Sequence, residues 1–315
     1  MSLQQINRED IVKKTRTFIH AIFAFALVLS LSANVVYAED QPAAAPAAAA
    51  PDAAAAAPAP PAVTGSAAMS ILSRYIFRGY ELSSHSAVFQ PSLTINYMGF
   101  SANLWSNIDS SENPTQSFLT VPTSRGHNNY DETDLTLSYT YNIDKLALTG
   151  GFVYYGTEYA PETEEIFISG TYDMIAHPTL AIYRDVNHYP GTYINLSFSQ
   201  SVPVFKLPNG DATVDLGASF GYEAGSSNYW VTSRVSGNAI TTGGKYSALH
   251  DGMVKVGLTL PLTKMFSVQP VVQYWFPLST DANKRYYFNG SPVEYNPNGH
   301  LDETVVAGVN LTFSF

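Results

Sequence analysis

The sequence contains no cysteine, little charge and no long apolar run beyond its amino-terminal segment. Without cysteine, the chain cannot form disulfides, zinc thiolate sites, covalent haem attachments or a lipoprotein anchor. Only 13% of its 315 residues are charged. No later segment reaches the roughly 18 consecutive apolar residues that a membrane-spanning helix requires. These absences exclude a disulfide scaffold and a helical membrane domain.

Aromatic residues are abundant instead, with 21 Tyr and 17 Phe, and such residues favour strands and interfaces.

Residues 1–38 read as a secretory signal peptide. Lys13, Lys14 and Arg16 precede the apolar stretch FIHAIFAFALVLSL, and Val36-Tyr37-Ala38 fits a cleavage site. The alternative is an uncleaved membrane anchor. We therefore expect an exported chain.

Residues 39–68 form an Ala/Pro-rich periplasmic linker in our interpretation. Repeated proline prevents a long helix and favours extended, disordered chain, so the linker is either a passive tether or an arm that contacts cell wall or a periplasmic partner. The signal holds four of the 16 basic and two of the 26 acidic residues, which leaves a net charge of −12. An acidic chain disfavours nucleic acid as a partner.

Residues 69–315 show a two-residue alternation of apolar and polar side chains, which is typical of strands with two different faces. The alternation predicts about twelve strands, most of 8 to 14 residues, a length that suits tilted strands crossing a bilayer. Short turns follow every second strand and longer loops follow the others, as in outer-membrane barrels. We expect an all-β fold, a transmembrane antiparallel up-and-down β-barrel. The predicted strands lie near residues 69–80, 87–98, 100–107, 131–142, 145–155, 164–173, 178–185, 191–202, 212–222, 249–262, 266–277 and 302–315.

Aromatic residues recur where the predicted strands would meet the membrane interfaces. The closing stretch VVAGVNLTFSF alternates strictly and ends on Phe315, as expected for the interfacial end of the last strand. Such an ending also resembles the signal that the bacterial barrel-assembly machinery reads. Tyr80, Tyr155, Trp275 and Phe276 are further expected interface aromatics. The principal candidates at the interface are Tyr139, Tyr141, Tyr154, Tyr274, Phe313 and Phe315.

The stretch SRYIFRGYEL, with Gln90-Pro91, Gly99-Phe100 and Trp105-Ser106-Asn107, resembles the proteobacterial TorF-type porin family, also labelled Gcw_chp. The resemblance covers roughly residues 69–202. Arg74 departs from it, because the family usually has an acidic residue there. The resemblance implies an outer-membrane barrel that forms a pore, with outer-membrane lipid as its surroundings, and it implies no particular substrate.

Counting in twos places a set of charged side chains on the inward face toward the loop end of the barrel. Two readings remain open. The charges could form an internal salt-bridge network, or they could form a constriction whose acidic excess favours cations or neutral solutes. The candidate lumen residues are Arg74 and Arg78 on the first strand, Glu132 and Asp134 on the fourth, Glu165 on the sixth and Asp185 on the seventh.

Catalysis has little support in the sequence. His250-Asp251 is the best pair for general-base chemistry, but no serine stands at a recognisable spacing from it. No metal-ligand cluster and no phosphate-binding glycine loop occurs, so we expect no enzyme, metal or cofactor. The sequence thus predicts a porin-like channel for small solutes or ions in the outer membrane. The alternative is a plugged structural, adhesive or docking barrel without transport.

Overall fold

The computed structural model describes residues 62–111 and 129–315. The expected signal peptide, most of the expected linker and the loop segment 112–128 lie outside the described residues. Twelve strands of the described chain form one closed antiparallel barrel, so the predicted fold class is confirmed. The wall strands are β1 (Thr64–Leu72), β4 (Val88–Tyr97), β5 (Phe100–Asp109), β6 (Asn129–Ile143), β7 (Leu146–Thr157), β8 (Thr163–Tyr172), β9 (Thr179–Asp185), β10 (Gly191–Leu207), β11 (Gly210–Gly225), β14 (Ser247–Pro261), β15 (Phe266–Pro277) and β18 (Thr304–Ser314).

Each wall strand pairs with its sequence neighbour in the wall, and β1 closes the barrel against β18. Ser66 lies opposite Ser314, and Gly65 and Phe315 exchange two backbone hydrogen bonds of 2.8 and 2.9 Å. Closure leaves neither β1 nor β18 as an open edge, which satisfies the main-chain groups of both strands. The first and last strands of the wall are therefore adjacent in space.

The wall has apolar side chains on its outer face and polar side chains on its inner face, the reverse of the distribution in a water-soluble protein. On β6, Leu135, Leu137 and Tyr139 point outward and are exposed, whereas Thr136 and Ser138 between them are buried inside. Exposed apolar side chains recur on the other wall strands as well. A sheet that alternates in this way suits a hydrocarbon exterior and a polar interior. No helix among residues 62–111 and 129–315 has the length and apolarity to cross a membrane.

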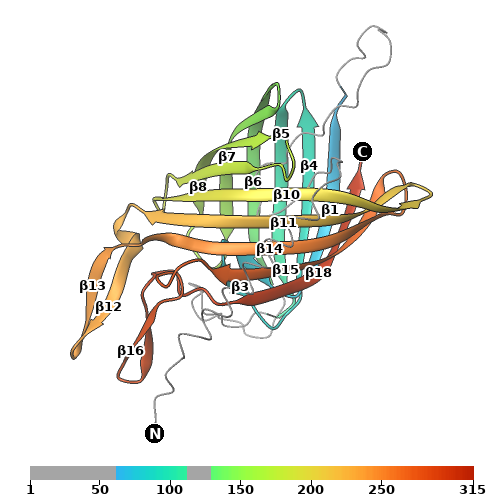
Figure 1. Cartoon of the computed structure of the whole chain (residues 1–315). Helices are drawn as coiled ribbons and strands as arrows, with labels where there is room; N and C mark the ends of the chain where they lie inside the picture. The colour runs from blue at the N-terminus through green and yellow to red at the C-terminus, as the bar shows by residue number, and fades with distance from the viewer. Residues whose placement is uncertain (1–61, 112–128) are drawn as a thin grey trace. The chain divides into compact units, whose positions relative to one another are not determined.

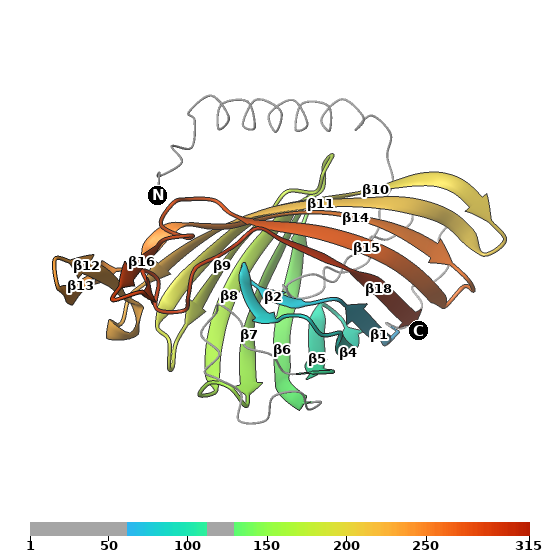
Figure 2. The ribbon, with the colours of Figure 1, turned by 90° about the horizontal axis from the view of Figure 1, so that it is seen from below.

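The connections differ at the two ends of the barrel. Short turns join β4 to β5, β6 to β7, β8 to β9, β10 to β11 and β14 to β15, at the end that holds Thr64 and Phe315. At the other end, the long connections carry two hairpins outside the wall, which Figures 1 and 2 show away from the carboxy-terminus. These are β12 (Val231–Ser236) with β13 (Ala239–Lys245), preceded by the 3₁₀ turn η1 (Asn228–Trp230), and β16 (Arg285–Phe288) with β17 (Ser291–Glu294).

The predicted first strand, 69–80, differs from the structure at both of its ends. Strand β1 begins at Thr64, so residues 64–68 of the expected linker pair with β4 and β18. The strand ends at Leu72, because its last wall partners are Val88 and Gly308. The chain then forms β2 (Tyr75–Phe77) and β3 (Tyr80–Ser83), a separate two-stranded sheet. Arg74 and Arg78 therefore do not stand on the first wall strand.

Candidate functional site in the barrel interior

A hairpin formed by β2 and β3 folds into the barrel from the loop end. Its Tyr75, Ile76, Tyr80 and Leu82 are all buried, and Figure 2 shows β2 between the opposing walls of the barrel. Tyr75, Tyr80 and Leu82 pack in a core with Val88, Trp105, Ala282 and Leu301. Ile76 packs in a second cluster with Met253, Trp275 and Val306. Residues from five wall strands and from the loop after β15 thus hold one inserted element.

The turn of this hairpin is Arg78-Gly79, and both residues have positive φ, 49° and 80°. Glycine suits the second position because L side chains rarely adopt this backbone conformation. A Cβ atom on Gly79 would also lie 2.7 Å from Cβ of Asp251. Close packing and backbone conformation therefore both require glycine where the hairpin tip meets β14.

Arg78 is held by a carboxylate and by aromatic rings. Its Nη1 and Nη2 donate to Oε1 and Oε2 of Glu165 at 2.8 and 2.7 Å. The guanidinium lies 4.8, 4.9 and 4.3 Å from the ring centroids of Phe77, Tyr183 and Tyr193. The Tyr155 hydroxyl donates to Oε2 of the same glutamate at 2.9 Å. This is a buried bidentate ion pair with cation–π support.

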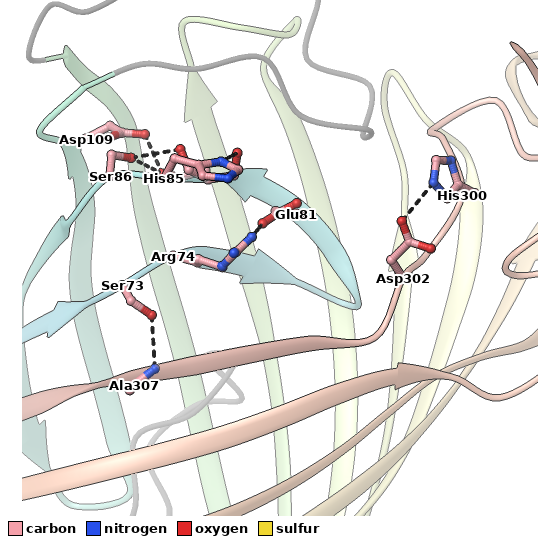
Figure 3. A network of polar contacts seen from close by, with 11 residues as sticks. Ser73, Arg74, Glu81, His85, Ser86, Asp109, His300, Asp302 and Ala307 are labelled. Carbon is pink, nitrogen blue, oxygen red and sulfur yellow. Dashed lines mark hydrogen bonds and ion pairs between the residues drawn. The ribbon is translucent and has the colours of Figure 1, made fainter.

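Polar contacts also fix the base of the hairpin, as Figure 3 shows. Arg74 pairs with Glu81 across the two strands of the hairpin. Ser83 donates its hydroxyl hydrogen to Oδ2 of Asp109 at 2.5 Å. The amide of Ala307 donates to Oγ of Ser73 at 3.0 Å, which joins the chain just after β1 to β18. The predicted lumen residue Arg74 is thus a structural contact of the hairpin.

The four acidic candidates have different partners. Glu165 holds Arg78, and Glu132 accepts a hydrogen bond from Tyr159. Asp185 accepts from Thr163 Oγ1 at 2.6 Å and from two backbone amides of residues 187 and 189 at 3.0 Å, so it fixes the loop after β9. Asp134 is buried, and its Oδ1 has no hydrogen-bond partner among the described residues.

Two further carboxyl residues face the interior and were not among the lumen residues predicted from the sequence. Glu223 and Asp251 are both buried near the hairpin, and Asp251 accepts hydrogen bonds of 3.1 Å from the Tyr193 hydroxyl. The alternation that ends at Tyr222 in our prediction, continued by one residue, would place Glu223 inward. Asp251 lies in a β-bulge opposite β11, where counting in twos fails.

Two cavities within the described part of the barrel meet at the hairpin tip. The larger, about 550 Å³, extends toward the turn end and is lined by polar side chains such as Gln90, Ser92 and Thr136. The smaller, about 100 Å³, opens toward the loop end and is lined by Tyr159, Tyr229 and other aromatic residues. Phe77, Arg78, Tyr155 and Tyr193 line both cavities.

Charge is distributed unevenly between the two cavities. The smaller one is lined by Arg78 and four carboxyl residues, Glu132, Glu165, Asp185 and Glu223. The charged residues lining the larger one are Arg74, Arg78, Lys255 and Asp134. Carboxyl residues therefore outnumber basic residues in the lining of the smaller cavity, and an acidic lumen stays a prediction.

The aromatic candidates divide between the two faces of the wall. Tyr139, Tyr141, Phe313 and Phe315 are exposed on the outside, toward the turn end. Tyr154 and Tyr274 are partly exposed, near the loop ends of β7 and β15. The next residue along each strand, Tyr155 or Trp275, faces the interior, and Tyr80 lies in the hairpin. Our expectation for Tyr80, Tyr155 and Trp275 at the interface was wrong, since alternation and the inserted hairpin direct them inward.

His250 and Asp251 have separate partners. Nδ1 of His250 lies 2.7 Å from the Tyr246 hydroxyl, while Asp251 binds Tyr193.

At the rim, Nδ1 of His300 lies 2.9 Å from Glu294, and Nε2 lies 3.0 Å from Asp302. The hydrogen bond to Glu294 raises the pKa of His300, despite the opposing effect of its partial burial. Among the described residues, no three His, Asp or Glu side chains are placed to hold a metal ion.

No protein-family model and no curated protein matches the chain. Solved structures that are similar in fold include the NanC porin, with a TM-score of 0.45, 11% identity and coverage of 81% of this chain and 100% of that one. OmpT, an outer membrane protein of Vibrio cholerae, has a TM-score of 0.33 and 8% identity, covering 81% and 99%. An anion-selective porin from Comamonas acidovorans has a TM-score of 0.31 and 8% identity, also covering 81% and 99%. Similarity at this level carries no argument about what this chain binds or transports.

Proposed function

We propose that the chain is an outer-membrane channel for small hydrophilic solutes or ions, narrowed by the inserted hairpin. The observation that carries this proposal is the cavity of about 550 Å³ inside a closed barrel. Its lining combines apolar and aromatic side chains with serine, threonine, asparagine and glutamine side chains, and these polar groups suit hydrated solutes. A barrel of twelve strands is wider than the eight-stranded kind that side chains fill, so its interior has room for solutes.

The exterior of the barrel supports placement in the outer membrane. Outward apolar side chains such as Leu137, Ile168 and Val256 would contact lipid, and exposed aromatics near the turn end would lie at the interface. The amino-terminal signal peptide that we predict would direct the chain out of the cytoplasm. The barrel-assembly machinery would recognise the strand that ends at Phe315.

Selectivity would arise at the narrow loop end. Four carboxyls and one arginine line the smaller cavity, so a solute that passes there meets an acidic excess. Rings of acidic side chains favour cations in pores. We therefore propose a preference for cations or neutral solutes over anions. We further propose that the chain acts as a channel and not as an enzyme.

Planar-bilayer recording of the refolded protein tests the proposal. We expect discrete conductance steps and, under a salt gradient, a reversal potential that shows cation preference. Replacing Glu132, Glu165 and Glu223 by Gln should shift the reversal potential toward zero. An unchanged reversal potential in this triple variant would contradict the proposed selectivity.

The clamped hairpin favours a second candidate function. Arg78 is fixed by Glu165 and three rings at the boundary between the two cavities, which would suit a permanently plugged barrel with a structural, adhesive or docking role. Electrical silence from protein that is shown to be folded and inserted would favour this alternative over the channel.

A further inference from the structure

The inserted hairpin leaves one carboxyl oxygen of the lumen residue Asp134 without a hydrogen-bond partner among the described residues. Both carboxylate oxygens of Glu165 bind Arg78, and Glu132 accepts a hydrogen bond from Tyr159. Asp134 is 7% exposed, and its Oδ1 meets no hydrogen-bond donor among residues 62–111 and 129–315. A buried polar atom without a partner is costly, and such groups in native structures need an explanation. A ligand that donates a hydrogen bond would provide one.

The sheet register places two aromatic side chains beside this carboxylate. On β6, Asp134 lies directly opposite Trp105 of β5 on one side and opposite Tyr155 of β7 on the other. Side chains that are paired in this way have Cβ atoms about 5 Å apart. Asp134, Trp105 and Tyr155 all line the larger cavity, next to the hairpin tip. The carboxyl group of Asp134 therefore lies between two rings in the wall of the lumen.

The cations that line the same cavity do not satisfy Asp134. Arg74 pairs with Glu81, and Arg78 pairs with Glu165. Lys255 stands on β14, which lies half-way round the barrel from β6 in the strand order. Neither arginine that lines the cavity therefore pairs with Asp134 on the β5–β7 wall.

We propose that Asp134, with Trp105 and Tyr155, binds the ammonium group of small amine-bearing solutes. An ammonium group supplies N–H donors for the carboxylate and positive charge for the flanking rings. A divalent metal fits less well, since Ca²⁺ and Mg²⁺ need about six oxygen ligands. This inference rests on the proposed channel and deepens it, because it names a substrate class for the lumen.

Competition in bilayer recordings tests the site. In sodium chloride, methylammonium should reduce the sodium current of the wild-type channel in a saturable way. Asp134→Asn should raise the half-blocking concentration about tenfold to a hundredfold, the range for loss of a hydrogen bond to a charged group. Tetramethylammonium, which carries the same charge but no N–H donor, should block far more weakly than methylammonium.

Asp215→Asn is the matched control. Asp215 also faces the interior, but Ser201, Thr213 and Gln269 donate hydrogen bonds to its carboxylate at 2.6, 2.9 and 2.7 Å. Removing this charge should leave the methylammonium block close to its wild-type concentration. Equal block in wild type and Asp134→Asn, or equal block by the two ammonium ions, would overturn the inference while the sodium current still supported a channel.

A binding measurement separates the site from the channel. Methylammonium titrated into the folded protein in detergent should change the tryptophan fluorescence, and the change should vanish in Trp105→Phe and in Asp134→Asn. Saturable binding by an electrically silent protein would support the site and count against the channel. Absence of any saturable change in the folded wild type would overturn the site.

Discussion

Arg78 and Glu165 lie 87 residues apart in the sequence and form a bidentate ion pair inside the barrel, with both N–O distances below 3 Å. The pair joins the tip of an inserted hairpin to strand β8 of the wall. It lies at the boundary between two cavities, so it connects the stability of the hairpin with the width of the lumen.

Replacing Arg78 by Met should destabilise the protein by about 3–5 kcal/mol, because Glu165 is left buried without its partner. The same change should increase single-channel conductance, since the guanidinium no longer fills the boundary between the cavities. Denaturant unfolding in micelles and bilayer recordings would measure the two effects. In Arg78→Met combined with Glu165→Gln, much of the stability should return while conductance stays high. Equal stability of the single and double variants would contradict the role of the ion pair.

Gly79→Ala should destabilise the hairpin by about 1–3 kcal/mol beyond the cost of the backbone conformation, because the new methyl group meets Asp251. Gly290→Ala is the matched control, since Gly290 has a φ of 82° and open space around its Cβ position. Denaturation midpoints of the two variants would be compared. If both variants lose the same stability, packing at the hairpin tip does not restrict position 79.

Leu137→Lys tests the hydrocarbon-facing exterior. Leu137 lies outward near the middle of β6, where a lysine should cost about 2–4 kcal/mol in lipid vesicles. Tyr141→Lys, on the same face but near the turn end, should cost about 0–1 kcal/mol. Reversible unfolding from vesicles would measure both. A lysine that costs the same at both positions would argue against a membrane boundary at the turn end.

Protonation of His300 should stabilise the rim segment that contains β16 and β17. Its pKa is raised in the folded chain by Glu294, with Asp302 also favouring and Arg285 opposing the charged form. The stabilisation is therefore full below the unfolded value of about 6.5 and disappears as pH rises through the folded pKa. Amide hydrogen exchange, corrected for intrinsic rates, should show stronger protection of residues 284–302 at about pH 6 than at about pH 8.5. His300→Gln should remove this difference; its persistence would identify another group.

Strand alternation predicted most of the wall because each strand has a lipid-facing and a lumen-facing side. The first strand was mispredicted because SRYIF continues the alternation of the residues before it. Where the wall ends is decided by its neighbours, since Leu72 is paired with Val88 and Gly308, and no sequence pattern in the strand itself contains that information.

The site was predictable in its residue types and not in its pairings. Counting in twos placed Glu132, Asp134 and Glu165 inward, where the structure has them. The partner of Glu165 depends on a hairpin that reaches into the lumen, and its tip could not be located from periodicity. The same hairpin explains why Asp134 and Glu165, on wall strands of one sheet, have such different surroundings.

The seam between β1 and β18 has a consequence for the order of assembly. Each of the other wall pairs joins strands that follow one another in the barrel sequence, so each pair can form as soon as its own two strands are in place. The seam, with its two hydrogen bonds between Gly65 and Phe315, must wait for the final strand. Until then, two unpaired edges remain, and long-range closure of this kind slows folding. A partner that shields these edges during assembly would therefore act on the strands at the two termini of the barrel.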